Sequence, residues 1–259
     1  MADQSSGPSQ QARRLRPVKS LIRAIDLLDT LVDAGEALGV TDLATATGFS
    51  KTATYNLVTT LESRGLIRRD GGNRYGLGWR LLELGEYARM QSTLGELARP
   101  HLETLSDLAG ETAFAGVLDG DSTLCLDMVE SRRSVPSDWA PGRRALLEEN
   151  AAGELLLAYA SPRRRRRYAQ SRPEGAAAVL ARLEGIRGTG LSFAPDDPAS
   201  MWASVAVPVR DGSSDVVGTI GLIGPKSRLN EARMRELTPP LCAEAEAMSR
   251  SLANFVPEH

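Results

Sequence analysis

The sequence contains few of the residues that build disulfide frameworks or metal sites. Two cysteines, Cys125 and Cys242, and two histidines, His101 and His259, occur among its 259 residues. The cysteines form no CxxC or other metal-ligand spacing, so we expect free, buried thiols in a reducing compartment. His101 follows Pro100 within a helical pattern, which favours a packing or helix-surface role over catalysis. We therefore predict that the protein holds no metal and no cofactor.

Long apolar runs are also absent. No segment is long enough to cross a bilayer, and no apolar stretch follows the early arginines as it would in a signal peptide. We therefore expect a cytoplasmic protein without a membrane partner.

The chain lacks the motifs of common enzyme classes. It has no GxSxG elbow, Walker A motif, HExxH or strand-linked GxGxxG, and GTIGLIGPK lacks the P-loop spacing. Glu148, Glu149 and Glu154 form an acidic cluster that would suit acid–base chemistry, but exposed or salt-bridged carboxylates are the commoner outcome. We predict no catalytic residues and a protein that is not an enzyme.

Charge is unevenly distributed along the chain. The formal net charge is −2, so no overall positive field attracts the protein to a polyanion. Residues 1–80 hold 11 Lys and Arg against 8 Asp and Glu, whereas residues 81–259 hold 20 against 25. A mildly basic first part and an acidic remainder indicate two domains with different tasks.

The beginning of the chain is polar and rich in Ser and Gln, without apolar periodicity. We expect a disordered tail over residues 1–17. Arg13, Arg14 and Arg16 would suit phosphate contacts, although a solvated tail is the simpler interpretation.

Three helical patterns and a hairpin follow the tail. The first helix is indicated by apolar residues at helical spacing, which are Leu21, Ile25, Leu28 and Leu31. We expect Thr41 to cap a short second helix and Ser50 to cap a third. Asp-Gly-Gly-Asn at residues 70–73 then separates two short extended runs, which is a hairpin signal. This order predicts a winged helix-turn-helix domain over residues 18–78.

The third helix carries a face suited to DNA. Ala53, Leu57 and Leu61 fall on one stripe, which we assign to the core. The opposite side is polar, without a carboxylate before Glu62, and consists of Lys51, Thr52, Tyr55, Asn56 and Thr59. Such side chains suit base edges in a major groove, and Ser50 begins the same helix. Arg68, Arg69 and Arg74 on the hairpin would contact phosphates or a minor groove. A solvated helix face is the alternative, but the order of elements favours double-stranded DNA as the partner.

The remainder of the chain mixes helices and strands. Residues 79–95 are expected to form a linker helix, with helical breaks at Gly95 and Pro100. Residues 96–259 are expected to form a mixed α/β domain with two strands between 112 and 130, a helix over 143–160, a hairpin turning at 211–215 and a helix from 230 to 254. Because strands and helices do not alternate regularly, the predicted fold class is α+β.

The chain resembles the IclR family of bacterial transcription regulators. The family pattern LA..TG..K.TA...L..L...G is matched by Leu43-Ala44, Thr47-Gly48, Lys51, Thr52-Ala53, Leu57, Leu61 and Gly65, and the hairpin ending by Tyr75, Leu77-Gly78, Leu81 and Leu84-Gly85. The similarity continues through LARPHLETLSDLAGET, the ALLEENAAGELLLA segment and VAVPVRD...VVGTIGLIGP. The resemblance implies an N-terminal winged helix, a linker helix and a GAF-like effector domain. It also implies homodimers or tetramers that repress or activate transcription in response to small molecules.

The family's small-carboxylate site is altered in this chain. The resemblance carries that site onto Ala151, Ala152, Ala194, Ser204, Gly221 and Ile223. Only Ser204 keeps a hydroxyl group, and Met201 enlarges the preceding loop. A carboxylate ligand needs donors that offset its desolvation. We therefore expect a neutral, apolar or cationic effector, with an unliganded, purely oligomerising domain as the alternative.

Five consecutive arginines, Arg163 to Arg167, are the densest positive charge in the chain. They follow Ser161-Pro162, which suits a helix start, and five arginines cannot all face a core. We favour a solvated helix, followed by intersubunit pairing and then by direct DNA contact. The expected function is a DNA-binding regulator, a repressor in preference to an activator. The competing class is a metabolite-binding module without its own operator.

Overall fold

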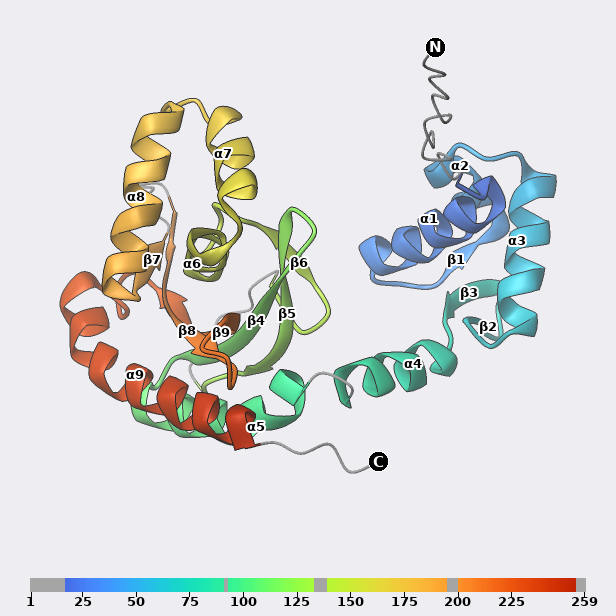
Figure 1. Cartoon of the computed structure of the whole chain (residues 1–259). Helices are drawn as coiled ribbons and strands as arrows, with labels where there is room; N and C mark the ends of the chain where they lie inside the picture. Colours follow the sequence, from blue (N-terminus) through green and yellow to red (C-terminus); the bar gives the residue numbers. More distant parts are fainter. Residues whose placement is uncertain (1–16, 91–92, 133–138, 195–199, 255–259) are drawn as a thin grey trace, which may run out of the picture. The chain divides into compact units, whose positions relative to one another are not determined.

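The computed structural model describes residues 17–90, 93–132, 139–194 and 200–254 (Figure 1). Within these ranges the chain forms two compact units, which divide between Tyr87 and Ala88. The predicted disordered tail lies outside the described residues apart from Pro17.

The first unit is a three-helix domain with a small sheet. Its helices are α1 (Lys19–Ala34), α2 (Val40–Thr47) and α3 (Lys51–Ser63). The antiparallel sheet has the order β1 (Leu38–Gly39), β3 (Arg74–Leu77), β2 (Ile67–Arg69). The helices and hairpin share one core, built from Leu27, Leu31, Leu43, Val58, Leu61, Ile67 and Tyr75. The winged helix-turn-helix prediction is confirmed, with β1 as an additional short strand.

Several local expectations for this unit are wrong by one or two residues. Helix α2 begins after Gly39, whose backbone nitrogen donates to the Asp42 side chain at 3.3 Å, so Thr41 lies inside the helix. On α1, Leu21 and Ile25 are exposed, while the buried residues are Leu27 and Leu31. On α3, Ala53 and Leu57 are only half-buried, and the buried stripe is Thr54, Val58 and Leu61. Contacts with the neighbouring elements, rather than the spacing of apolar residues alone, determine which side of each helix is buried.

The expected breaks at Gly95 and Pro100 are also wrong. Helix α4 spans Trp79–Met90, and α5 spans Thr93–Ala109 with both residues inside it. An internal proline removes one backbone hydrogen bond. Helix α5 buries an apolar face with Leu94, Ala98, Leu102 and Leu105 against the second unit's sheet, and this burial outweighs the lost bond.

The second unit is built on a six-stranded antiparallel sheet of order β6-β5-β4-β9-β8-β7. The strands are β4 (Thr112–Asp119), β5 (Ser122–Val129), β6 (Arg144–Leu146), β7 (Ser192–Ala194), β8 (Trp202–Arg210) and β9 (Val216–Pro225). The predicted hairpins β4–β5 and β8–β9 are confirmed. In the second turn, the Asp211 carboxylate accepts from the backbone nitrogens of Ser213 and Asp215 at 2.9 and 3.0 Å.

Helices cover both faces of this sheet (Figure 1). Helices α5 and α9 (Glu231–Asn254) pack on one face, and α6 (Ala151–Tyr159) and α8 (Ala176–Thr189) on the other, with α7 (Pro162–Gln170) beside α8. The long last helix is confirmed. The helix expected over 143–160 is wrong at its start, because residues 144–146 pair with β5 as an edge strand and the helix begins at Ala151.

Alternation along the central strands separates two cores. Val205 and Val207 of β8 and Leu222 of β9 face α5 and α9. Ala206 and Ile223 lie on the opposite side, in the core beneath α6 and α8. Successive strand residues point to opposite faces, so Ser204 and Gly221 share the α6 side. The predicted effector positions on β8 and β9 therefore lie on one surface of the sheet.

Candidate functional site

The polar face of α3 is fully available to solvent. All five predicted base-reading residues, Lys51, Thr52, Tyr55, Asn56 and Thr59, are exposed. Ser50 caps the helix as expected, because its hydroxyl oxygen accepts from the Ala53 backbone nitrogen at 3.3 Å. Thr59 donates its own hydroxyl hydrogen to the Tyr55 carbonyl oxygen at 2.9 Å. Its side chain thus presents a methyl group and an acceptor, a combination that suits thymine or an amino donor.

The wing is a tight hairpin with a fixed turn. The Asp70 carboxylate accepts from the backbone nitrogens of Gly72 at 3.0 Å and Arg74 at 3.1 Å, and Asn73 adopts φ 58°. Left-handed backbone is tolerated by asparagine better than by most residues. The Arg68 guanidinium lies over the Trp79 ring, 5.3 Å from its centroid. The turn and this ring contact hold the first wing arginine in place.

The other two wing arginines have internal partners. Arg69 lies 3.6 Å from the Glu62 carboxylate and also contacts Tyr75. Arg74 donates to the Ala37 carbonyl oxygen at 2.6 Å and lies 3.5 Å from Glu36. Both side chains remain more than 40% exposed. A phosphate would compete with these carboxylates, so each arginine is positioned but not fully free.

In the second unit, Ser204 connects three elements. Its hydroxyl donates to the Ala194 carbonyl oxygen on β7 and accepts from the Ala151 backbone nitrogen at the start of α6, both at 3.0 Å. Ser204 and Ala151 are almost completely buried. Three of the predicted effector positions are therefore brought together. Their polar groups bind one another, since the single retained hydroxyl satisfies both the helix N–H and the strand carbonyl.

Gly221 and Ile223 lie beside this contact. Ile223 pairs with Ser204, and Gly221 pairs with Ala206, across the β8–β9 ladder. A Cβ atom on Gly221 would lie 2.4 Å from the Phe114 ring and 2.3 Å from the Val205 carbonyl oxygen. The Phe114 ring packs edge-on against Trp139, with centroids 4.8 Å apart. Aromatic side chains therefore fill the space above Gly221.

The start of α6 is held by its own cap. The Asn150 side-chain oxygen accepts from the Gly153 backbone nitrogen at 3.1 Å. A Cβ atom on Gly153 would lie 2.3 Å from the Leu147 carbonyl oxygen, so only glycine permits this approach of helix and preceding turn. Ala152, like Ala151, is completely buried. These residues fix the helix over Ser204 with short side chains.

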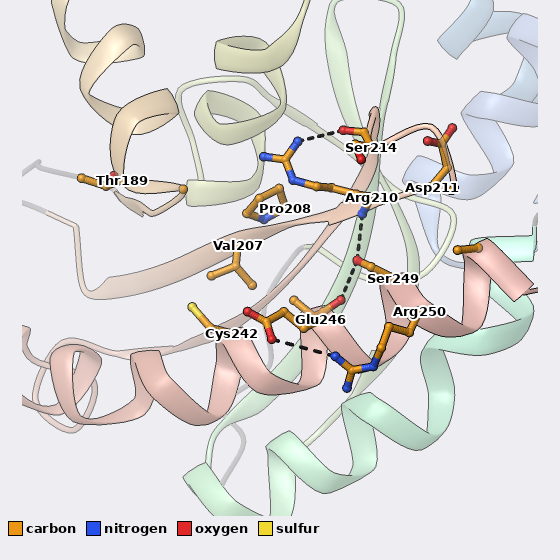
Figure 2. Close-up of a pocket in the computed structure, with 14 residues that line it drawn as sticks. Thr189, Val207, Pro208, Arg210, Asp211, Ser214, Cys242, Glu246, Ser249 and Arg250 are labelled. Atoms are coloured by element: carbon orange, nitrogen blue, oxygen red, sulfur yellow. Dashed lines mark hydrogen bonds and ion pairs between the residues drawn. The ribbon is translucent and has the colours of Figure 1, made fainter.

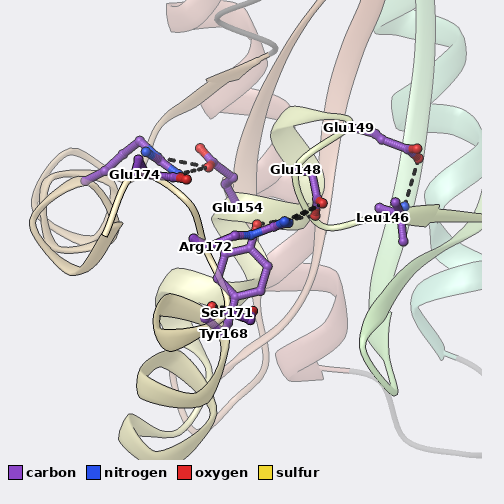
Figure 3. Close-up of polar contacts among 9 residues, drawn as sticks. Leu146, Glu148, Glu149, Glu154, Tyr168, Ser171, Arg172 and Glu174 are labelled. Carbon is purple, nitrogen blue, oxygen red and sulfur yellow. Dashed lines mark hydrogen bonds and ion pairs between the residues drawn. The ribbon is translucent and has the colours of Figure 1, made fainter. Parts of the chain in front are cut away.

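The three acidic residues of this segment are all engaged (Figure 3). Glu148 accepts from Arg172 at 2.7 Å and from the Tyr168 hydroxyl at 3.3 Å, and the arginine lowers the pKa of its carboxyl. Glu149 accepts from the Leu146 backbone nitrogen at 2.8 Å. The expectation of exposed or salt-bridged carboxylates is confirmed for these two.

Glu154 is the buried member of the three acidic residues. It accepts from Arg182 at 2.9 Å, and Arg182 also lies 3.1 Å from Glu174 (Figure 3). Burial raises the pKa of Glu154, and the Arg182 charge acts in the opposite direction. Arg182 thus holds together a carboxylate in the core and a carboxylate at the surface.

A cleft of about 960 Å³ opens beside these residues. Its lining includes Glu148, Glu154 and Ala194, together with Phe193 of β7 and Met234 of α9. Among the predicted effector positions, Ala194 lines this cleft. Met201 lies at the surface, with 76% of its area exposed, so its side chain does not fill a cavity. Sequence reasoning missed the contributions of β7 and α9, because nothing in the chain order shows that they meet.

A second cleft, of about 580 Å³, lies on the other face of the sheet between β8 and α9 (Figure 2). Pro208, Arg210, Cys242 and Glu246 lie along it, and the Arg210 backbone nitrogen donates to the Ser249 hydroxyl at 2.9 Å. None of the predicted site residues lines this cleft. Its residues come from the end of α8, from β8 with the turn that follows it, and from α9, so no single local motif marks the cleft.

The cysteines and histidine have structural surroundings. Cys125 is a buried free thiol whose pKa is raised to about 12 by desolvation and by Asp127. Cys242 is free but only half-buried, so the expectation of two buried thiols is wrong for it. His101 on α5 lies 2.6 Å from the Glu244 carboxylate on α9, in a helix–helix contact.

No metal-ligand cluster and no membrane-spanning helix occur in the described part of the chain. Groups of three or more His, Cys, Asp or Glu side chains in metal-binding geometry are absent from the described residues. No helix within the described ranges is long and apolar enough to cross a bilayer.

Comparison with known proteins gives a consistent assignment. Residues 20–71 match the IclR helix-turn-helix domain, and residues 90–250 match the bacterial transcriptional regulator IclR C-terminal domain. The HTH-type transcriptional regulator BhcR of Paracoccus denitrificans is 27% identical over 246 residues, covering 91% of this chain and 88% of that protein. The HTH-type regulator KdgR of Escherichia coli is 26% identical, with 91% and 93% covered.

Solved structures of the same architecture cover almost the whole chain. The Thermotoga maritima IclR structure has a TM-score of 0.74 at 25% identity, covering 91% of this chain and 99% of that one. An IclR homolog from Microbacterium hydrocarbonoxydans, crystallised with 4-hydroxybenzoate, has a TM-score of 0.82 at 21% identity, with 91% and 100% covered. Members of the matched family are DNA-binding transcription regulators, not enzymes. With one domain model matching its helix-turn-helix and another most of its remaining length, this chain belongs to the IclR family of bacterial transcriptional regulators.

Proposed function

We propose that the protein is a transcriptional repressor that reads an operator of two-fold symmetry with α3 and the wing of each protomer. The observation that carries this proposal is the α3 surface, where five polar side chains without a negative charge are exposed on one side. Repression requires only that the bound protein exclude polymerase from overlapping DNA, whereas activation requires a further contact. A reporter placed behind the protein's own upstream DNA tests the sign: deletion of the protein should raise expression.

Asn56 is the proposed base-specific contact. It is exposed on α3, and an asparagine amide pairs bidentately with adenine. We expect selection from random DNA to return an adenine in each half-site, with half-site centres about 10 bp apart or a multiple of that. The Asn56→Arg variant should shift this base toward guanine. An asymmetric site, or an unchanged base in the variant, would refute the assignment.

Homodimer formation is supported by exposed apolar side chains on the first unit. Val18, which precedes α1, and Leu21 and Ile25 on α1 are 63%, 61% and 49% exposed, and on α4 Trp79 and Tyr87 are 68% and 71% exposed. Helical spacing places the first three on one face. Large exposed apolar patches mark protein interaction sites. We propose that a second copy covers them, and that two dimers pair into a tetramer. Analytical ultracentrifugation of the wild type and of Leu21→Glu measures this directly.

The effector domain is proposed to sense a small molecule that is neutral, apolar or aromatic, bound in or beside the cleft lined by Ala194. Support comes from the Ser204 hydroxyl, which already has both a donor and an acceptor partner. A ligand that binds there stabilises the domain by mass action.

A thermal-shift screen tests this effector class. Glyoxylate and pyruvate should give no shift at millimolar concentration, whereas a larger neutral or aromatic compound should. The aromatic acid 4-hydroxybenzoate is a useful comparison, because a protein of the same fold was crystallised with it. The ligand should also change operator affinity by the same factor by which operator changes ligand affinity. A clear shift with pyruvate contradicts the proposed class.

An unliganded, oligomerising domain is the second candidate. The packing of Phe114 over Gly221 favours it, because this ring, which Trp139 contacts edge-on, occupies the surface on which the family's polar groups would stand. No shift with any compound, together with normal operator binding, would support this candidate. A gel shift with the protein's own upstream DNA would be seen for either kind of regulator, but not for a metabolite-binding module without an operator.

A further inference from the structure

Four residues of the arginine run form a concave, incompletely neutralised basic site on the second unit. Ser161 caps α7 and Pro162 occupies its first turn, as the sequence predicts. Arg163, Arg166 and Arg167 recur at spacings of three and four residues, so they share one side of the helix. With Arg164 they line a cleft of about 840 Å³ against the β4–β5 turn.

Like charges at these spacings repel one another along a helix, and α7 contains no acidic residue to offset them. The acid that lines the cleft is Asp121, which lies 2.5 Å from Arg167. The neighbouring Asp119 is engaged by Arg144 at 2.5 Å. Four cations therefore face one anion, and the cleft keeps a net positive charge of three.

Arg164 supplies a second observation. Its Nε and Nη2 atoms are buried, and within the described part of the chain neither has a hydrogen-bond acceptor. The Asp121 carboxylate is 3.9 Å from Nη2, which is too far for a hydrogen bond. Buried donors on a charged group ordinarily have acceptors, because a buried donor without a hydrogen bond destabilises the protein. The Arg164 charge therefore has no hydrogen-bonded carboxylate within the described residues, and it adds to the positive charge of the cleft.

From this charge and concavity, we propose that the cleft binds a small ligand with two or more adjacent phosphate groups. Guanidinium groups match phosphate oxygens bidentately, and several in one cleft favour a multiply charged anion over a single carboxylate. A long polyanion such as DNA is disfavoured, since residues 81–259 carry 20 cations against 25 anions and Asp121 would repel its backbone. The site is separate from α3 and does not depend on the proposed operator or effector.

Titration calorimetry of the full chain with sodium tripolyphosphate, at constant ionic strength, tests the proposal. Arg166→Gln with Arg167→Gln should weaken binding about tenfold or more. The matched control is Arg165→Gln with Arg187→Gln, which removes the same charge. Arg165 and Arg187 lie 3.3 and 3.5 Å from Glu184 and do not line the cleft. The affinity of this control variant for tripolyphosphate should change by less than about threefold, because neither arginine lines the cleft.

A variant with increased affinity distinguishes loss of the binding site from misfolding. Asp121 is exposed, with 73% of its side chain accessible, and its charge opposes the ligand. Asp121→Asn should therefore tighten tripolyphosphate binding about threefold or more. Misfolding of the variant would weaken binding and could not produce this gain. Orthophosphate, with one phosphate group, should bind more weakly than tripolyphosphate.

The opposing outcomes are distinct. No saturable binding by the wild type, an equal loss in both double variants, or no gain in Asp121→Asn would each overturn the proposal. DNA affinity measured by fluorescence anisotropy should be the same in both double variants. A selective loss of DNA affinity in the Arg166/Arg167 variant would instead identify the cleft as a DNA contact, and would also overturn the proposal.

Discussion

The Ser204 hydroxyl oxygen accepts a hydrogen bond from the Ala151 backbone nitrogen at 3.0 Å, which ties strand β8 to the first residue of α6. Ser204→Ala would leave that N–H and the Ala194 carbonyl oxygen buried without their partner. We expect the free energy of unfolding to fall by about 1–3 kcal/mol, measured by urea denaturation.

Ser251→Ala is the matched control for this change. Ser251 is exposed on α9, and its hydroxyl donates to the Ala247 carbonyl oxygen one turn earlier. Its removal should change stability by no more than about 0.5 kcal/mol. Equal effects of the two substitutions would show that the Ser204 contact does not stabilise α6.

Gly221→Ala should destabilise the domain. The added methyl group would stand 2.3 Å from the Val205 carbonyl oxygen and 2.4 Å from Phe114. Because one of these neighbours is backbone, we expect a loss of about 1–3 kcal/mol, and Phe114→Leu should restore only part of it. Gly185→Ala on α8 meets no atom within 4 Å and should stabilise the helix by about 0.5–1 kcal/mol. A neutral Gly221→Ala would contradict the close approach of β8 and β9.

Neutralising a wing arginine should weaken binding to all DNA sequences alike. We expect Arg69→Gln to remove one phosphate contact, so the plot of log affinity against log salt should become shallower by about one unit. Arg165 belongs to the second unit and lies 3.3 Å from Glu184. The Arg165→Gln variant should therefore leave the salt slope unchanged. Fluorescence anisotropy from low to moderate salt measures both slopes, and equal slopes for wild type and Arg69→Gln would remove Arg69 from the interface.

The Glu148–Arg172 pair should make stability depend on pH. Arg172 lowers the pKa of Glu148 below its ordinary value of 4.5, so the folded state favours the ionised carboxylate. Its stabilisation is fully present above pH 4.5 and is lost as pH falls through the folded pKa. Because the Glu148 side chain is 39% exposed, we expect no more than about 1 kcal/mol.

Denaturation of wild type and Glu148→Gln at neutral and acid pH measures this contribution. The stability difference between them should be largest near neutrality and should shrink on acidification. Glu246→Gln provides the control, because Glu246 is exposed and lies 3.9 Å from Arg250. A difference that grows at low pH has the wrong sign for this pair.

The sequence predicts the elements more reliably than their packing. The cap of α3, the start of α7 at Pro162 and the turns at residues 70–73 and 211–215 depend on neighbouring residues, and these predictions are confirmed. The start of α6 was predicted too early, because residues 144–146 become a strand only when β5 lies beside them. Local periodicity cannot reveal such a distant partner.

The candidate site shows the same limit. The family resemblance supplied Ala151, Ala194 and Ser204, but the mutual hydrogen bonds of these residues depend on three elements that are far apart in sequence. The half-buried Leu57 and the buried Thr54 similarly reflect how α3 packs against α2 and the hairpin. Burial of this kind depends on tertiary contacts, which a single helical period does not encode.

The alternation of β8 and β9 has a consequence for how such a protein diverges. Even-numbered residues of β8 and odd-numbered residues of β9 face α6, whereas their immediate neighbours support α5 and α9. Substitutions at alternate positions can therefore reshape the surface beneath α6, while the residues that support α5 and α9 keep their side chains. Insertion of one residue within either strand would turn the residues beyond the insertion to the opposite face of the sheet. The surface beneath α6 can therefore change through replacement of single side chains, but not through changes in strand length.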